Sequence, residues 1–84
     1  MARADLDDVA ASVDALPDVE RAWRMESFGA PVVALAVPRG AGDPEAARTR
    51  LRDAGLRPAG ADGDSHVGHV GDVDRHRFVD PDAR

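Results

Sequence analysis

The amino-acid sequence predicts an α+β domain, a two-layer sandwich in which helices cover one face of an antiparallel sheet. Three observations predict it. Apolar residues have helical spacing between positions 6 and 16 and change to a spacing of two from position 19. An uninterrupted apolar run at positions 32–37 has the length of a buried strand, and a second helix signature follows. The expected order is α-β-β-α followed by one or two short β strands, in a single domain covering residues 1–84.

The first helix is predicted by apolar residues at positions 6, 9, 10, 13 and 16, which lie on one stripe of a helix. Asp5 can cap its N-terminus, and Asp7 and Asp8 complement the positive end of the helix dipole. Pro17 disfavours helical geometry at the preceding residue, so the helix is expected to end at Leu16.

Residues 19–27 are predicted to form the first strand. Val19, Trp23 and Met25 fall on one face of such a strand, where they alternate with polar residues. A continued helix is the alternative, because Val19, Ala22 and Trp23 also fit a helical stripe.

A turn at residues 28–31 is expected to lead into a second strand at residues 32–37. This strand is apolar throughout and has a proline on either side, so it should be central and buried. The second helix is predicted from Asp43 as its N-cap and Pro44 as its first helical residue, and it should end at Gly55.

The last third of the chain is rich in Gly, Asp and His. Residues 67–70 and 75–79 are expected to pair as two short strands across a turn at residues 71–74. Residues 57–72, which are rich in Gly, Asp and His, are expected to be mobile.

Part of the pattern resembles a known family. Residues 16–19 read Leu-Pro-x-Val at the end of a helix, and a Gly-containing turn and a Val-rich strand precede a helix that begins with Asp43. Over residues 6–56 this is similar to the ferredoxin-like regulatory domains of the ACT and Lrp/AsnC C-terminal types. The resemblance implies a ferredoxin-like fold. The opening strand of that family has no counterpart, so the C-terminal segment would have to fill its position.

The composition resembles that of small proteins from salt-loving archaea. The chain has 13 Asp against 3 Glu, a net charge of −5, and an apolar set dominated by Ala and Val. High salt strengthens apolar burial and screens repulsion between acids, so such a sequence is expected to be halophilic. The absence of Lys, Asn, Ile and Tyr is also what a GC-rich genome produces. The absence of Cys excludes disulfides and thiolate metal clusters.

The N-terminal residues lack the apolar stretch of a signal peptide, and the run at 32–37 is far too short to cross a bilayer. A cytoplasmic location and no membrane partner are therefore expected.

All three histidines lie near the C-terminus, as His66, His69 and His76. Imidazole and carboxylate groups suit zinc, nickel or copper, so these three are the candidate metal ligands. On a regular strand His66 and His69 would point to opposite faces, and they can meet only if Gly68 or Gly71 breaks the strand. The alternative interpretation is a polar hairpin with solvated histidines.

Four arginines lie close together, at positions 48, 50, 52 and 57, and could contact phosphates. They do not share a helix face, and the chain is acidic, so no nucleic-acid partner is expected. The sequence contains no phosphate-binding loop and no nucleophile motif. It therefore predicts no catalytic residue and no cofactor.

Trp23 is the only tryptophan. It is expected to pack against the first helix, and the alternative is an exposed interface residue. The function that follows is that of a small acidic non-enzymatic domain acting by protein association, as a homodimer or with a partner. The alternative is a regulator that binds a metal or small ligand through His66, His69 and His76.

Overall fold

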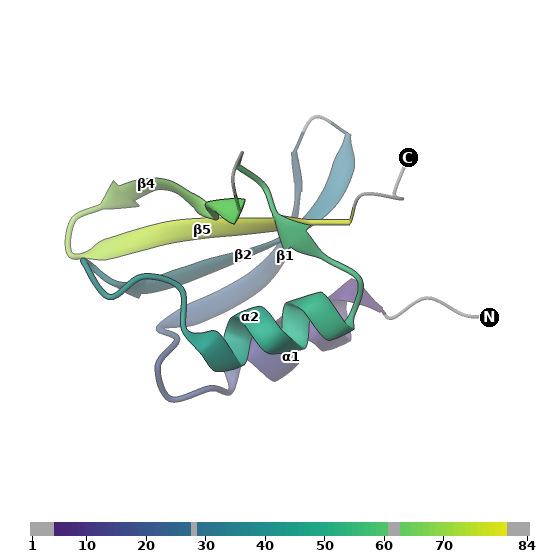
Figure 1. The fold of residues 1–84 in the computed structure, drawn as a ribbon, viewed down its shortest axis with the longest axis horizontal. Helices are drawn as coiled ribbons and strands as arrows, with labels where there is room; N and C mark the ends of the chain where they lie inside the picture. The colour runs from purple at the N-terminus through teal and green to yellow at the C-terminus, as the bar shows by residue number, and fades with distance from the viewer. Residues whose placement is uncertain (1–4, 28, 61–62, 81–84) are drawn as a thin grey trace.

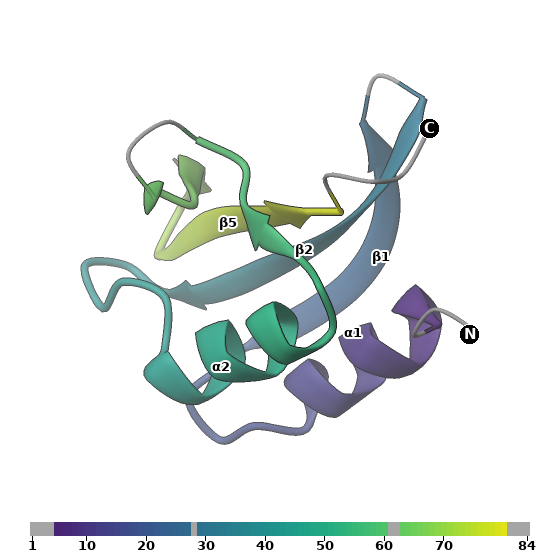
Figure 2. The same cartoon turned by 45° about the vertical axis from the view of Figure 1, so that its right-hand side comes forward.

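A computed structural model describes residues 5–27, 29–60 and 63–80. Two helices lie on one face of a five-stranded antiparallel sheet, which confirms the predicted α+β sandwich (Figures 1 and 2). The elements, in chain order, are α1 (Leu6–Asp14), β1 (Arg21–Ser27), β2 (Ala30–Pro38), α2 (Glu45–Asp53), β3 (Arg57–Pro58), β4 (His66–Val70) and β5 (Val73–Val79). Neither helix is long and apolar enough to cross a membrane, within the residues described.

The C-terminal strand lies inside the sheet. The strand order is β1-β2-β5-β3, and β4 also pairs with β5. Because β2 takes the whole of one edge of β5, the short strands β3 and β4 share the other edge, with β3 at Phe78–Val79 and β4 at the opposite end. The position beside β2 is thus filled from the C-terminal segment.

Helix α1 forms as its sequence predicts. The Asp5 carboxylate accepts a hydrogen bond from the backbone N–H of Asp7 at 2.9 Å, which is the expected N-cap. The helix ends at Asp14, although Leu16 still packs on the core. The strand predicted from residue 19 begins at Arg21 instead, because Val19 lies in the connection and is buried with the helices.

Strand β2 is buried on both faces, as its uninterrupted apolar sequence predicts. Val33, Leu35 and Val37 face the helices and form the core with residues of α1, α2 and β5. The alternating residues point to the opposite side of the sheet.

Helix α2 differs from expectation at its start. Its N-cap residue is Pro44, and no side chain caps the helix, so the prediction of Asp43 as N-cap is wrong. The helix ends at Asp53, two residues before the predicted end, and the predicted glycine cap follows it. Gly55 has a φ of 92°, and the Leu56 N–H donates to the Leu51 carbonyl at 2.9 Å, which is a Schellman motif.

Strands β4 and β5 form the predicted hairpin, but β4 is irregular. His66 pairs with His76, and Gly68 pairs with Arg75, so Val67 is an extra residue in a β-bulge. Gly68 has a φ of 143°, a value that residues with a Cβ rarely adopt. Two residues of the segment that was expected to be mobile, 61–62, lie outside the described residues, as does Phe28 of the 28–31 turn.

Candidate functional site

A buried polar network joins the start of α2 to the hairpin. The Ser65 Oγ lies 2.8 Å from His76 Nδ1 and 3.1 Å from an Asp43 carboxylate oxygen. The Arg48 guanidinium donates to the same Asp43 oxygen through Nε at 2.9 Å, and to the Gly63 carbonyl at 3.1 Å. Asp43 therefore holds the hairpin rather than the helix terminus, which explains why it does not cap α2.

The network determines which ring nitrogen of His76 donates to Ser65. A carboxylate that is paired with Arg48 can only accept, so the Ser65 hydroxyl donates to Asp43 and accepts the Nδ1–H of His76. The other ring nitrogen, Nε2, is buried without a hydrogen-bond partner. Burial lowers the pKa of His76, and the neighbouring carboxylate of Asp43 only partly opposes this effect.

Ser65, His76 and Asp43 are the residue types of a nucleophilic triad, but their order differs. In a triad the imidazole lies between hydroxyl and carboxylate, whereas here the hydroxyl lies between the other two groups. Ser65 is also only 2% exposed. Its proton is held by Asp43, so the arrangement gives the hydroxyl a structural contact rather than an activating base.

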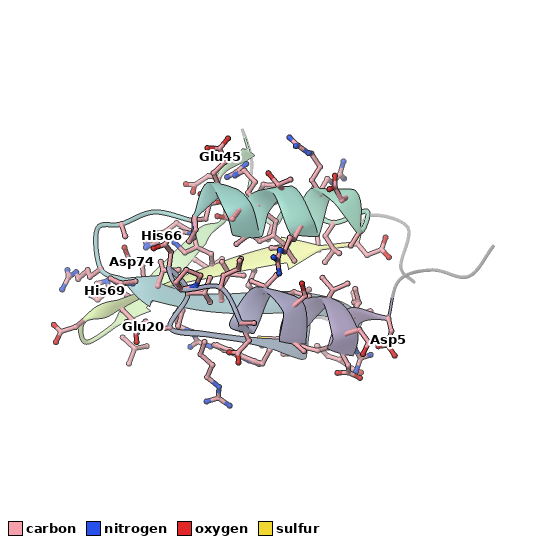
Figure 3. The ribbon with its side chains drawn as sticks, turned by 90° about the horizontal axis from the view of Figure 1, so that it is seen from below. Asp5, Glu20, Glu45, His66, His69 and Asp74 are labelled. Carbon is pink, nitrogen blue, oxygen red and sulfur yellow. The ribbon has the colours of Figure 1, made fainter. Side chains whose placement is uncertain are left out.

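The β-bulge places His66 and His69 on the same face of the hairpin. His69 pairs with Asp74 and His66 with His76, and Figure 3 shows His66, His69 and Asp74 at one end of the sheet. The Nε2 of His66 lies 3.4 Å from Asp74, whose other oxygen accepts from the Gly40 N–H at 2.9 Å. That backbone hydrogen bond is the main reason why the pKa of Asp74 is lowered.

A break at Gly68 or Gly71 was the condition under which His66 and His69 could share a face, and the bulge at Gly68 meets it. The rings of His66 and His76 lie edge to face with centroids 5.4 Å apart. However, no three His, Cys, Asp or Glu side chains of the described residues form a group that could hold a metal ion. Metal binding by His66, His69 and His76 stays a prediction.

The second candidate is the sheet face that the helices do not cover, here called the open face. Directly opposite residues of antiparallel strands point to the same side, so the strand register defines its members. They include Arg21, Trp23 and Met25 of β1, Val32, Ala34 and Ala36 of β2, Arg57 of β3, Val70 of β4, and Val73, Arg75, Arg77 and Val79 of β5. Figures 1 and 2 show both helices on the other side of the sheet.

Trp23 lies on the open face, so the expectation that it packs against the first helix is wrong. The core beneath the helices takes Ala22 from β1 instead. One-residue alternation explains the result, because residues 22 and 23 must point to opposite faces once Ala22 faces α1. Trp23 is half-buried, and the guanidinium carbons of Arg21 and Arg75 lie 5.2 and 5.6 Å from its ring centroid.

Small residues in the middle of the open face are covered by large ones at its sides. Ala34 and Ala36 of β2 are buried although no helix lies over them. Ala36 stands between Arg21 and Arg75 in the register. Arg75 reaches the Trp23 ring from two strands away, so these side chains meet above the alanines and shield them with aliphatic and aromatic surface.

The charge of the open face is opposite to that of the chain. Its strand positions hold four arginines, 21, 57, 75 and 77, and no Asp or Glu, whereas the whole chain carries a net charge of −5. None of these four arginines forms an ion pair within the described parts of the chain. The open face thus presents unpaired guanidinium groups beside an aromatic ring.

Of the four neighbouring arginines in the sequence, 48, 50, 52 and 57, only Arg57 lies on the open face. Arg48 pairs with Asp43, and Arg50 donates at 2.8 Å to the Ser12 carbonyl and hydroxyl, so these two hold α2 to its neighbours. The signal for the arginines of the open face was the alternation Arg75-His76-Arg77. It could be interpreted only after His76 was known to point toward the helices.

No protein-family model, curated protein or solved structure matches this chain significantly.

Proposed function

We propose that this chain is a non-enzymatic binding module that acts by association with another protein chain through the open face. One observation carries the proposal. The helices cover only one face of the sheet, and the other face presents Trp23 among arginines that form no ion pair with any described residue. Trp and Arg are among the residue types most enriched at the energetic centres of protein interfaces.

Apolar surface beside these groups supports the same proposal. Val70 is 60% exposed, the largest value among the exposed large apolar residues described. It pairs with Val73 on the open face, next to the row that holds Arg75. An interface needs such apolar contacts near its polar ones, because the apolar part supplies most of the favourable free energy.

Site-specific photo-crosslinking tests the proposal. In one variant a benzophenone amino acid replaces Met25, a half-buried residue of the open face two positions from Trp23. In a matched variant it replaces the exposed Ala46 of α2. In the cells that make the protein, the Met25 variant should give a discrete adduct and the Ala46 variant should not. Adding Trp23→Ala should abolish the adduct, because Trp23 supplies the central contact.

The mass of the adduct identifies the class of partner. A doubled mass means a second copy of the chain, and any other discrete mass means a different protein. An absence of adducts at Met25, or equal adducts at Met25 and Ala46, would contradict association through the open face.

A further inference from the structure

We infer that the open face recognises an acidic segment of a different protein chain, whose carboxylates meet Arg21, Arg75 and Arg77 while its apolar groups contact Trp23. This inference rests on the proposed function and adds the chemistry of the partner. Charge complementarity carries it. Although the chain is acidic, the sheet face that its helices leave uncovered holds four arginines that form no ion pair within the described residues.

The spacing of the arginines suits an extended segment. Arg75 and Arg77 are two residues apart on β5 and point to the same side, which separates their Cα atoms by about 7 Å. Carboxylates at alternate positions of an extended chain have the same separation. Arg21 lies in the same row as Arg75, on the other side of β2, where a third carboxylate of the partner can reach it. Guanidinium groups bind carboxylates through two parallel hydrogen bonds, which adds geometric selectivity.

The contacts with Trp23 preorganise the guanidinium groups of Arg21 and Arg75 before a partner binds. Arg21 and Arg75 both lie beside its ring, at 5.2 and 5.6 Å from the centroid. A guanidinium that stacks on an aromatic ring keeps its N–H groups available in its own plane. Arg21 and Arg75 therefore lose less side-chain entropy on binding a carboxylate than freely rotating arginines would.

A second copy of this chain fits the open face poorly. A symmetric dimer places the same patch on both sides of the interface, so it would bring the arginines of one copy against those of the other. Like charges in direct opposition are destabilising, and the open face has no Asp or Glu in its strands to pair with them.

A nucleic acid also fits less well than an acidic protein. Surfaces that bind single strands stack successive bases on several aromatic side chains. Trp23 is the one aromatic residue that the described strands place on the open face, since Phe78 is buried beneath the helices. The net charge of −5 also repels a long polyanion more strongly than a short segment with few carboxylates.

A peptide titration tests the inference. Trp23 is the only tryptophan and the chain has no Tyr, so its fluorescence reports on the open face alone. The probe is a ten-residue peptide with Glu at every second position, and a Lys peptide of the same pattern and a ten-base oligothymidylate are the comparisons. Binding is followed by fluorescence and by calorimetry, at the lowest KCl concentration at which the circular dichroism of the protein is native.

The Glu peptide should bind saturably and should weaken as KCl is raised. Arg75→Gln should weaken binding about fivefold, the effect of losing one exposed ion pair of about 1 kcal/mol, and Arg77→Gln should act similarly. The matched control is Arg24→Gln, since Arg24 is an exposed arginine of β1 that points to the other side of the sheet, and it should leave the affinity unchanged. Calorimetry keeps the comparison valid if Arg75→Gln alters the emission of Trp23 directly.

Three results would overturn the inference: no binding of the Glu peptide, equal effects of Arg75→Gln and Arg24→Gln, or tighter binding of the oligothymidylate or the Lys peptide. If the Met25 crosslink still forms in any of these cases, association through the open face stands and only the acidic character of the partner is wrong. If the crosslink is also absent, the proposed function itself fails.

Discussion

His76 is the residue whose environment has the clearest measurable consequence. It is 4% exposed and neutral, and protonation would give Nε2 a buried N–H without an acceptor. Its pKa in the folded protein therefore lies below the usual value of 6.5, which the unfolded chain keeps. Between these two pKa values the unfolded state binds the proton and the folded state does not, so stability is full above pH 6.5 and falls as the pH decreases below it.

We expect the urea midpoint of unfolding to fall between pH 7.5 and pH 5.5, a range well above the acidic one in which Asp74 titrates. His76→Gln should be less stable at both pH values but should lose most of this pH dependence. His69→Gln is the matched control, because His69 is exposed on the same hairpin, and it should keep the dependence of the wild type. A midpoint that does not change with pH in the wild type would contradict the assignment of a neutral buried His76.

Truncating Trp23 and Phe78 compares how much each face of the sheet contributes to the free energy of unfolding. Phe78 is 1% exposed in the core beneath the helices, so Phe78→Ala should cost about 3–5 kcal/mol of unfolding free energy. Trp23→Ala, on the half-buried open face, should cost only about 1–2 kcal/mol in spite of the larger side chain. Urea unfolding of both variants measures the difference. Equal losses would mean that the open face contributes to the core as much as the helix side does.

At the scale of elements, the bulge in β4 determines which side chains the hairpin presents on each face. Val67 is the extra residue, and the φ of 143° at Gly68 allows the strand to return to register opposite Arg75. Because of this one extra residue, His66 and His69 share a face although they are three positions apart. A regular strand would have placed them on opposite faces.

A pair of changes in β4 tests the bulge. Gly68→Ala should destabilise the wild-type chain by about 1–3 kcal/mol, because alanine is strained at this φ. Deleting Val67 makes His66 and Gly68 consecutive and leaves the pairs from Gly68 to Val70 intact, so position 68 no longer needs the unusual backbone. In the deletion background Gly68→Ala should therefore cost little. Equal costs in both backgrounds, measured by urea unfolding, would show that the strain at Gly68 does not come from the bulge.

At the scale of the whole molecule, the open face and helix α1 carry opposite charges. The arginines of the open face lie on one side of the sheet, and Asp7, Asp8 and Asp14 lie on α1 on the other side. The carboxylates of α1 form no ion pair among the described residues, so their mutual repulsion is relieved mainly by dissolved salt.

The melting temperature is therefore expected to rise from low to molar KCl. Below about 0.1 M salt the screening length exceeds about 10 Å, so the acidic groups of a chain with thirteen Asp repel one another. The Ala- and Val-rich core supplies little apolar stabilisation to offset this repulsion. Melting followed by far-UV circular dichroism across a KCl series measures the effect. A melting temperature that is the same at both extremes would remove the halophilic interpretation and leave the GC-rich genome as the explanation of the composition.

The sequence alone determined the elements whose signals are local. The Asp5 cap, the glycine cap of α2 at Gly55 and the buried strand at 32–37 depend on residues within a few positions of one another, so a single sequence carries their information. The hairpin at the C-terminus was predictable for the same reason. The α+β class followed from the order of these elements, because amphipathic helices that flank a strand pair must bury their apolar stripes against the sheet.

The tertiary structure decided which way the side chains face and which distant groups they meet. Trp23 lies on the open face because Ala22 belongs to the core on the helix side, and Asp43 contacts Arg48 and Ser65 instead of capping α2. These outcomes depend on strand register, and one residue of register exchanges the two faces of a strand. Register is set by the bulge at Val67 and by packing between segments far apart in the chain, which no local pattern records.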